Sequence, residues 1–232
     1  MTNNFSCACI VPFYNEGERI LRVLDVLTKV TNLSEVICVD GGSTDNESEQ
    51  IQKHFSKVKL VRLIEGKGKS ATVKRGLKEV KVPYVMLIDA DLQNLKHLEL
   101  EKAISTIQQN QNIDMLVLRR KHDPWFSKMV RGDITVTGER VMRTEDLRDV
   151  FIGSPVSYQL EFAINLYMAQ RMKHVYWMYH SGINVSKIEK FGFFEGAKQE
   201  INMYRSIFAY AGILYSLRIM ATFSRKEATT TS

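Results

Sequence analysis

The sequence predicts an α/β fold: a mostly parallel β-sheet with helices on both faces, followed by a C-terminal helical region. In the first half of the 232-residue chain, short apolar runs alternate with amphipathic helical patterns, which is typical of strands and helices that follow one another in βα units. Hydrophobic residues make up 44% of the chain and charged residues 25%, enough for a large domain with a buried core. The alternation stops after Arg120, so residues 1–120 are expected to form one half of the protein and residues 121–223 the other.

Each strand of the first half is expected from a short apolar run, and each helix from apolar residues that recur at helical spacing. The expected strands span residues 6–12, 35–40, 57–63, 84–89 and 114–118. The expected helices span residues 16–30, 44–54, 71–80 and 95–109. Thr44 and Glu47 have the spacing of a capping box, and Ser70 is the expected N-cap of the third helix.

The second half is less regular. Residues 121–138 are polar and lack apolar periodicity, so they are expected to form a loop with short helical pieces, as functional segments often do. A helix at 156–172, an aromatic strand at 174–179 and a long helical stretch at 195–223 are expected to follow. Residues 224–232 are expected to form a disordered tail.

The charge distribution points to an anionic partner. The net charge is +6, and the segment from Arg171 onward holds nine Lys or Arg against four Glu. A basic region favours phosphates, nucleic acid or an acidic membrane surface, although a solvated basic face has the same composition. No nucleic-acid recognition motif accompanies these residues, so nucleic acid is not the expected partner.

The cysteines and the N-terminus indicate a cytoplasmic protein. Cys7, Cys9 and Cys38 lie in apolar strand patterns, without the spacing of a metal site or a disulfide framework, which is typical of a reducing compartment. The N-terminus leads directly into a strand-like run, so no signal peptide is expected.

Polar clusters follow the strands expected in the first half. Because ligands of such sheets bind beyond the carboxyl ends of the strands, these clusters are expected to meet in one crevice. They are PFYNE at 12–16, DGGSTD at 40–45, GKGK at 66–69 and DADLQ at 89–93.

The DADLQ cluster predicts a divalent cation. Asp89, Asp91 and Gln93 supply oxygen ligands at the end of an apolar strand, and such ligands suit Mg²⁺ or Mn²⁺, which bridge diphosphate oxygens. The alternative is a strand-end turn in which Asp89 caps the next helix. Two neighbouring carboxylates repel each other unless a cation lies between them, which favours the metal.

Two other nucleotide-binding motifs are excluded. The stretch GKGKS ends like a P-loop, but Leu63 stands where the first glycine of that motif belongs. A dinucleotide fold needs G-x-G-x-x-G after the first strand, and the chain has PFYNEGER there.

The motifs IVPFYNE, VDGGSTD, GKGKSATVKRGL and VMLIDADLQ, in this order, resemble the nucleotide-binding half of family 2 glycosyltransferases with the GT-A fold. The chain is most similar to the dolichyl- or polyprenyl-phosphate sugar synthases, whose later signatures resemble YQLE at 158–161, HSGINVSK at 180–187 and Glu200-Ile201. The resemblance implies a GDP- or UDP-sugar donor, Mg²⁺ or Mn²⁺ as cofactor, and a phosphate-bearing acceptor such as a polyprenyl phosphate.

The resemblance also implies roles for individual residues. It assigns nucleotide-sugar binding to Pro12, Tyr14, Glu16, Asp40, Gly42, Lys67, Lys69, Asp89 and Ala90. It assigns the metal and the diphosphate to Asp89, Asp91 and Gln93, with Asp91 also a catalytic residue. An acceptor phosphate is itself a nucleophile, whereas a hydroxyl acceptor needs a base. Glu161 is the candidate base; Asp146 is a second candidate, but Thr144 to Asp146 also fits a plain helix N-terminus.

The acceptor half departs from the polyprenyl-phosphate pattern. The arginine that this subgroup has before its G-x-S-K motif is missing; His180 stands nearest to that position, one residue out of register, and it is similar to the histidine that completes the metal site of glucosyl-3-phosphoglycerate synthases. His180 is therefore a candidate metal ligand or phosphate contact, against the alternative of an ordinary surface histidine. Arg119, Arg120 and Arg131 are expected to bind an anionic acceptor.

These departures leave alternatives open. Transfer to a soluble phosphorylated acceptor such as phosphoglycerate is one alternative, and an inactive nucleotide-sugar-binding scaffold is another. Residues 207–223 are apolar and flanked by basic residues, which fits a helix lying on a membrane surface, a core helix or a homo-oligomer contact.

Overall fold

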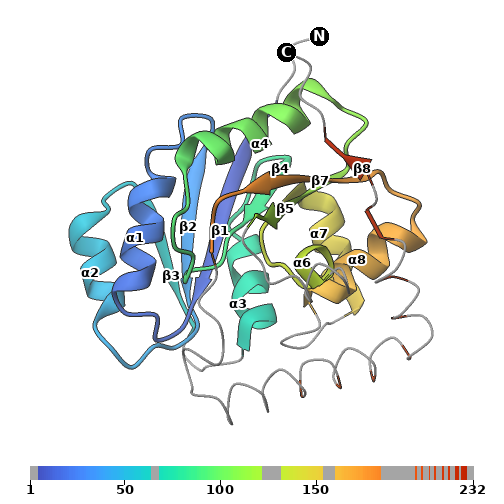
Figure 1. Cartoon of the computed structure of the whole chain (residues 1–232). Coiled ribbons are helices and arrows are strands. Elements are labelled where there is room, and N and C mark those ends of the chain that lie inside the picture. Colours follow the sequence, from blue (N-terminus) through green and yellow to red (C-terminus); the bar gives the residue numbers. More distant parts are fainter. Residues whose placement is uncertain are drawn as a thin grey trace.

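The computed structural model describes residues 5–63, 68–121, 132–153, 160–183, 223–224 and 226–228, with the isolated positions 202, 205, 209, 212, 216 and 219. Within them, the chain forms an eight-stranded sheet in the order β3-β2-β1-β4-β6-β5-β7-β8 (Figure 1). The strands are β1 (Cys7–Phe13), β2 (Glu35–Asp40), β3 (Val58–Arg62), β4 (Tyr84–Leu87), β5 (Met115–Arg120), β6 (Arg140–Arg143), β7 (Val175–His180) and β8 (Lys226–Glu227).

The sheet is mostly parallel. Strand β6 lies between β4 and β5 and runs antiparallel to both. The other pairings, from β3 to β4 and from β5 to β8, are parallel. The carboxyl ends of β1, β2 and β4 therefore meet at one edge, where the polar clusters follow.

Helices cover both faces of the sheet. They are α1 (Glu18–Leu27), α2 (Glu47–His54), α3 (Gly68–Leu77), α4 (His97–Gln109), α6 (Gly132–Thr135), α7 (Thr144–Val150) and α8 (Leu160–Gln170), with a 3₁₀ turn η1 at Phe151–Gly153. One hydrophobic cluster joins α1, α2 and α4 to strand residues such as Cys9, and a second joins α3, α7 and α8 to residues such as Ile10. Because successive strand residues point to opposite faces, β1 contributes to both clusters. In Figure 1, α1 and α2 lie side by side on one flank of the molecule.

The predicted fold class is confirmed, and the strands of the first half lie where their apolar runs indicated. Two predicted helix starts are wrong. Helix α2 begins at Glu47, with Asn46 at the N-cap position and without a side-chain cap hydrogen bond. Thr44 belongs to the strand-end loops, where its amide donates to Asn15 Oδ1 at 2.9 Å. Helix α3 begins at Gly68, so Ser70 is buried in its first turn and is not its N-cap.

Two strands were not predicted. Strand β6 has the sequence RVMR, and its arginines at both ends gave it the composition of a loop. Strand β8 lies in the segment that was expected to be a disordered tail. It pairs with β7, and the Ala228 amide donates to Trp177 O at 2.8 Å, because an uncovered sheet edge offers backbone groups that a short segment can pair with.

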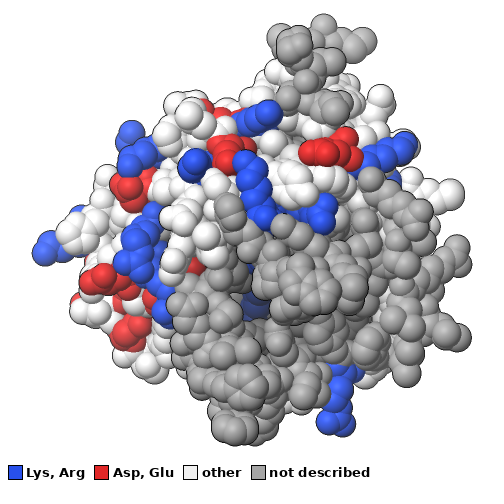
Figure 2. Space-filling model, in the orientation of Figure 1, with Lys and Arg blue, Asp and Glu red and all other residues white. Residues whose placement is uncertain are grey.

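The helical predictions in the second half are tested only in part. Helix α8 and strand β7 confirm the helix and the aromatic strand, with α8 described from Leu160. Most of residues 195–223 lie outside the described residues, as does most of the basic C-terminal quarter. In the described part of the chain, no helix is both long and apolar enough to cross a membrane. The described surface in Figure 2 carries Lys and Arg interspersed with Asp and Glu.

Candidate active site

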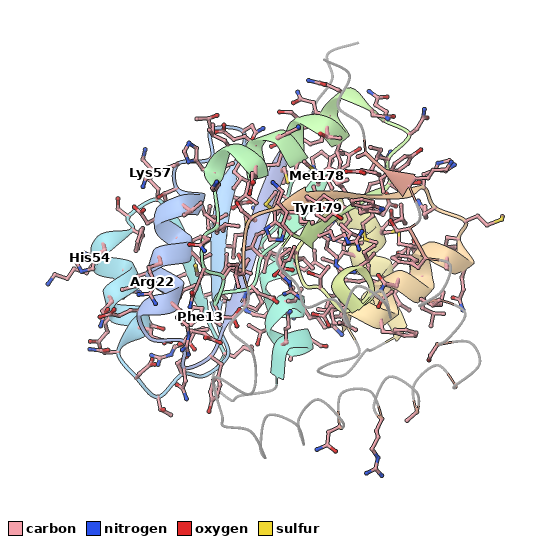
Figure 3. All side chains as sticks on the ribbon, in the orientation of Figure 1. Phe13, Arg22, His54, Lys57, Met178 and Tyr179 are labelled. Carbon is pink, nitrogen blue, oxygen red and sulfur yellow. The ribbon has the colours of Figure 1, made fainter. Side chains whose placement is uncertain are left out.

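The loops after β1 and β2 are joined by hydrogen bonds. Phe13, labelled in Figure 3, marks the carboxyl end of β1, and its carbonyl accepts from the Gly41 amide at 2.8 Å. The Asn15 amide donates to Ser43 Oγ at 3.0 Å, while Asn15 has a φ of 51°. A Cβ atom on Gly41 would lie 3.2 Å from Phe13 O and 3.5 Å from Tyr14 Cβ, so glycine permits this close approach.

Asp40 organises the loop after β2. The carboxylate is fully buried. Its Oδ1 accepts from the Gly42 and Ser43 amides at 2.9 and 2.7 Å, and its Oδ2 accepts from Ser48 Oγ at 2.6 Å and pairs with Arg62 Nε at 3.0 Å. Burial opposes ionisation, but the hydrogen bonds from Ser48, Ser43 and Gly42 outweigh it and lower the pKa of Asp40. Both oxygens are thus engaged in holding the loop and Arg62.

A pocket of about 240 Å³ opens beside this loop, lined by Gly42, Ser43, Arg62 and Leu63. Arg62 also donates to Ser43 O at 3.2 Å, which keeps its guanidinium at the pocket wall. Tyr14, 54% exposed, lies next to the same loop. An aromatic ring, a guanidinium and loop backbone together suit a planar, hydrogen-bonding ligand such as a nucleobase.

Other predicted nucleotide-binding residues lie around this edge. Pro12 is buried within β1 opposite Val39, and Glu16 forms an ion pair with Arg19 at 2.9 Å. Lys67 lies outside the described residues. The roles assigned to Pro12, Tyr14, Glu16, Asp40 and Gly42 stay predictions.

The centre of the site is an ion cluster of three segments. Lys69 Nζ, from the first turn of α3, lies 2.5 Å from Asp89 Oδ1 at the end of β4 and 2.7 Å from Glu161 Oε1 in the first turn of α8. Burial opposes the charge of Lys69, but the two carboxylates raise its pKa. Burial likewise opposes ionisation of Asp89, but Lys69, with Arg120 and Arg140 further away, lowers the pKa of Asp89. The sequence predicted that the segments of Lys69 and Asp89 would meet, but it did not indicate that Glu161 joins them.

Gly138 lies directly against the carboxylate and the ammonium of this cluster. A Cβ atom on Gly138 would lie 2.5 and 2.6 Å from the two carboxylate oxygens of Asp89, and 2.7 Å from Lys69 Nζ. Atoms this close cannot coexist, so only glycine lets the carboxylate and the ammonium rest against the chain before β6.

Arg140 holds α8 against the segment around β6. It is fully buried, and its guanidinium donates to Asn165 Oδ1 at 3.1 Å and to the Thr137 carbonyl. Asn165 donates in turn to Thr135 O at 2.7 Å. The position of α8, and with it Glu161, therefore depends on β6.

Glu139, beside Arg140, is also buried. It accepts a hydrogen bond from the Thr137 hydroxyl and lies 3.7 Å from Arg120 NH1. Sequence reasoning missed Gly138, Glu139 and Arg140. Their only signal is the run TGER, in which two opposite charges follow a glycine within a segment that resembles a loop.

The rest of DADLQ and the end of β7 lie beside one another. Ala90 and Asp91 are buried, 4% and 8% exposed. Gln93 is exposed and forms an antiparallel bridge with Ile183, with both N–O distances at 2.8 Å. His180 is only 1% exposed, and its Nδ1 accepts from the Gly182 amide at 3.2 Å. The alternative of an ordinary surface histidine is therefore wrong.

The predicted metal ligands do not form a closed site in this structure. Within the described ranges, no three His, Cys, Asp or Glu side chains are grouped so that they could hold a metal ion. The Asp89 carboxylate forms an ion pair with the Lys69 ammonium. The assignment of Asp89, Asp91, Gln93 and His180 as ligands stays a prediction.

The predicted acceptor arginines point in different directions. The Arg119 guanidinium lies 4.9 Å from the Trp177 ring centre and 5.3 Å from that of Tyr179, on one face of the sheet; Tyr179 is labelled in Figure 3. Arg120 projects to the other face, pairs with Glu139 and lies opposite His180 in the register of β5 and β7. Arg120 is therefore the arginine beside the ion cluster. Arg131 lies outside the described residues.

Asp146 belongs to the scaffold. Helix α7 begins at Thr144, which confirms the helix N-terminus expected there. The Asp146 carboxylate accepts from the Tyr167 hydroxyl at 3.0 Å and pairs with Lys173 Nζ at 3.1 Å. These contacts tie α7 to α8.

Glu47, at the start of α2, is a buried carboxyl group. It is 2% exposed, and neither carboxylate oxygen has a hydrogen-bond partner among the described residues. Burial, with the nearby Asp45 carboxylate and then Glu16, raises the pKa of Glu47 to about 8.

We expect a Glu47→Gln variant to be more stable than the wild type at alkaline pH. Between pH 4.5 and about 8 the folded chain binds a proton that the unfolded chain has lost, so the free energy of unfolding falls as pH rises, by up to about 1.4 kcal/mol per pH unit. The Glu47→Gln variant has no titrating group at this position, so its free energy of unfolding does not fall with pH for this reason. Urea unfolding should give stabilities within about 1 kcal/mol of each other at pH 5, and a gain for the variant on the order of 4 kcal/mol at pH 8.5. Glu49→Gln, at an exposed position of the same helix, is the control; equal pH profiles for both variants would contradict the prediction.

The fold and the site define a protein of the GT-A class: a mostly parallel sheet with a carboxylate pair after a central strand and a pocket at the ends of β2 and β3. The chain belongs to glycosyl transferase family 2, whose sequence profile matches residues 8–171. This confirms the family resemblance found in the sequence.

Relatives and solved structures agree with this family. The chain is 28% identical over 139 residues to undecaprenyl-phosphate 4-deoxy-4-formamido-L-arabinose transferase of Serratia proteamaculans (56% of this chain, 42% of the relative). It is 30% identical over 111 residues to dolichyl-phosphate beta-glucosyltransferase of Saccharomyces cerevisiae (42% and 33%). The chain thus spans less than half the length of these two relatives.

The fold itself is found in glucosyl-3-phosphoglycerate synthase of Mycobacterium tuberculosis. One solved structure of that enzyme, with Mn²⁺, UDP-glucose and phosphoglyceric acid, matches with a TM-score of 0.72 at 16% identity, covering 98% of this chain and 88% of the other. At this level of identity the similarity shows the fold alone.

Proposed function

We propose that the chain is a metal-dependent glycosyltransferase that moves a sugar from a nucleoside diphosphate sugar to a phosphate-bearing acceptor, a polyprenyl phosphate. The observation that carries the proposal is the ion cluster of Lys69, Asp89 and Glu161, which packs against Gly138. The same edge of the sheet holds the pocket lined by Gly42 and Arg62. The pocket would take the nucleoside and the ion cluster the diphosphate. Both named relatives act on lipid phosphates, according to their names.

A divalent cation fits the donor set of this site. Solved structures of the phosphoglycerate synthase hold Mn²⁺ or Mg²⁺. In this chain the Asp89 carboxylate already takes a cation, the ammonium of Lys69, and Asp89, Asp91, Gln93 and His180 would supply hard oxygen and imidazole ligands. When bound, the metal would neutralise charge on the departing diphosphate.

The position of Glu161 supports a phosphate acceptor. Its carboxylate is ion-paired with Lys69 at 2.7 Å, so it is poorly placed to accept a proton from an acceptor hydroxyl. A phosphate oxygen is already a nucleophile and needs no base. Arg120, near the ion cluster, is the proposed contact for that phosphate. A polyprenyl phosphate acceptor would bring the chain to a membrane surface, on the cytoplasmic side.

A soluble phosphorylated acceptor such as phosphoglycerate is the second candidate. The observation that favours it is His180, which is buried at the end of β7, one residue out of register with the arginine of the polyprenyl-phosphate pattern. Such an acceptor requires no membrane contact. The two candidates share the donor site and differ in the acceptor alone.

A melting-temperature panel would test the donor site. We expect UDP or GDP, together with Mn²⁺ or Mg²⁺, to raise the melting temperature, because a ligand of the folded state stabilises it by mass action. The responding nucleotide names the donor, and sugar transfer is then assayed with polyprenyl phosphate and with 3-phosphoglycerate. Absence of any metal-dependent shift across the panel, in a folded sample, would overturn the proposal.

A further inference from the structure

Lys69 occupies the metal-binding carboxylate of the proposed site. Its ammonium lies 2.5 Å from Asp89 Oδ1, so it is in direct contact with a carboxylate that would be a ligand of the divalent cation. The ammonium is held on its other side by Glu161 at 2.7 Å. The ammonium thus balances one of the two carboxylate charges, and the three side chains together keep one negative charge.

Lys69 and a divalent cation cannot share this position. Two like charges within about 4 Å repel by several kcal/mol at the effective dielectric near a protein surface, so a divalent cation on either oxygen of the Asp89 carboxylate would repel the ammonium that lies on Oδ1. The carboxylate cannot retreat on the side of Gly138, because the chain there leaves no room even for a methyl group. One of the two cations must therefore leave.

The lysine is the partner that can move. Its side chain is 32% exposed, more than that of Asp89 at 19% or Glu161 at 11%, so it is the least enclosed of the three. A lysine has a flexible four-carbon stem, whereas the carboxylate of Asp89 is held close to the backbone of β4. A donor diphosphate would offer the displaced ammonium a new anionic partner.

We propose that Lys69 is a positioning residue that holds the place of the divalent cation on Asp89 in the ligand-free chain, and that metal binding transfers its ammonium from Asp89 to the donor diphosphate while Glu161 stays its other partner. The inference rests on the proposed function, because it takes Asp89 as a ligand of the metal. Two consequences follow. First, the metal binds weakly alone, since it must displace Lys69. Second, it binds more tightly when a nucleoside diphosphate is present to accept the Lys69 ammonium. By reciprocity, the metal strengthens nucleotide binding by the same factor.

Mn²⁺ binding followed by electron paramagnetic resonance tests this exchange without any assay of turnover. Free Mn²⁺ is titrated with wild type, Lys69→Met and Lys69→Arg, each with and without UDP or GDP. We expect Lys69→Met to bind Mn²⁺ alone about tenfold more tightly than wild type, and to show a nucleotide-induced gain in affinity about tenfold smaller, because the diphosphate still binds the metal but no longer takes up a displaced Lys69. Lys69→Arg keeps a cation on Asp89 and should bind Mn²⁺ alone as weakly as wild type. Lys78→Met removes an exposed lysine just beyond α3 and should match wild type throughout.

A double variant guards against misfolding. Lys69→Met leaves two carboxylates without their ammonium, which costs stability. Lys69→Met/Glu161→Gln removes one charge of each sign and keeps the side-chain volumes. It should also bind Mn²⁺ about tenfold more tightly than wild type, whereas Glu161→Gln alone, in which Lys69 still pairs with Asp89, should not.

The outcomes separate the inference from the proposed function. Suppose that wild type binds Mn²⁺ with nucleotide, but that neither Lys69→Met nor Lys69→Met/Glu161→Gln binds Mn²⁺ alone more tightly than wild type. The exchange is then wrong and the glycosyltransferase proposal stands. If no form binds Mn²⁺, with or without UDP or GDP, the metal-dependent function is wrong and the exchange falls with it. Tighter binding of Mn²⁺ alone by both Lys69→Met and Lys69→Met/Glu161→Gln supports the exchange.

Discussion

Glycosyl transfer by an Asp91→Asn variant is expected to fall by roughly 10²–10³-fold. Asparagine has nearly the volume of aspartate, so the buried position, 8% exposed, keeps its shape and loses only the negative charge. A carboxylate next to Asp89 is proposed to help hold the cation that neutralises the departing diphosphate. The measurement is the initial rate of sugar transfer at saturating donor, together with the metal-dependent melting shift.

The control for this prediction is Asp25→Asn. Asp25 lies on α1 and forms an exposed ion pair with Lys29 at 2.7 Å, and such surface pairs contribute about 0–1 kcal/mol. The Asp25→Asn variant should transfer sugar at the wild-type rate. Raising the Mn²⁺ concentration should restore part of the rate of Asp91→Asn, because the defect lies in metal affinity. A variant that keeps wild-type turnover at low Mn²⁺ would show that Asp91 is not a metal ligand.

A Gly138→Ala variant is expected to lose at least about 100-fold in sugar transfer while it remains folded, since a misplacement of about 1 Å in an active site costs this much. The new methyl group would lie 2.5 Å from Asp89 Oδ1 and 2.7 Å from Lys69 Nζ, so the carboxylate must rotate away from its position. The φ of Gly138 is not among the positive values of the described glycines, so alanine fits the backbone and the effect is steric. Transfer rates and Mn²⁺ affinity, measured beside the melting temperature, check this prediction.

Gly76→Ala is the matched control, because the same methyl group meets the core instead of the site. On Gly76 it would lie 2.8 Å from Val39 Cγ2 and 2.9 Å from Ile10 Cγ2, and overpacking of this kind costs about 1–3 kcal/mol. We expect this variant to melt at lower temperature yet to bind nucleotide and metal normally while folded. If Gly138→Ala behaved like Gly76→Ala, the contact between Gly138 and Asp89 would have no role in transfer.

The elements of the first half were predictable because their signals are local. A strand such as β2 is one continuous apolar run, and it begins and ends at the residues predicted, 35–40. Parallel pairing then places the ends of such strands at one edge by a general rule of these folds. The predicted convergence of the loops at Asn15 and Ser43 needed no more than this.

Strand β6 could not be predicted in the same way. Its four residues carry arginine at both ends, and its pairing with β4 and β5 depends on segments distant in the sequence. The residues missed at the site, Gly138, Glu139 and Arg140, all lie at or just before this strand. Non-local pairing leaves little trace in the periodicity of a short segment.

The sequence by itself determined the family, the mostly parallel sheet and the residue types at its edge, since strand-end motifs such as DADLQ are continuous in the chain. Only the tertiary structure decided which of these residues meet. It brought Lys69 of α3 and Glu161 of α8 to Asp89, placed Gly138 beneath them and turned Arg119 and Arg120 to opposite faces of the sheet. The physical reason is that periodicity reports the path of one segment, whereas an ion cluster forms from the packing of several segments against a common sheet.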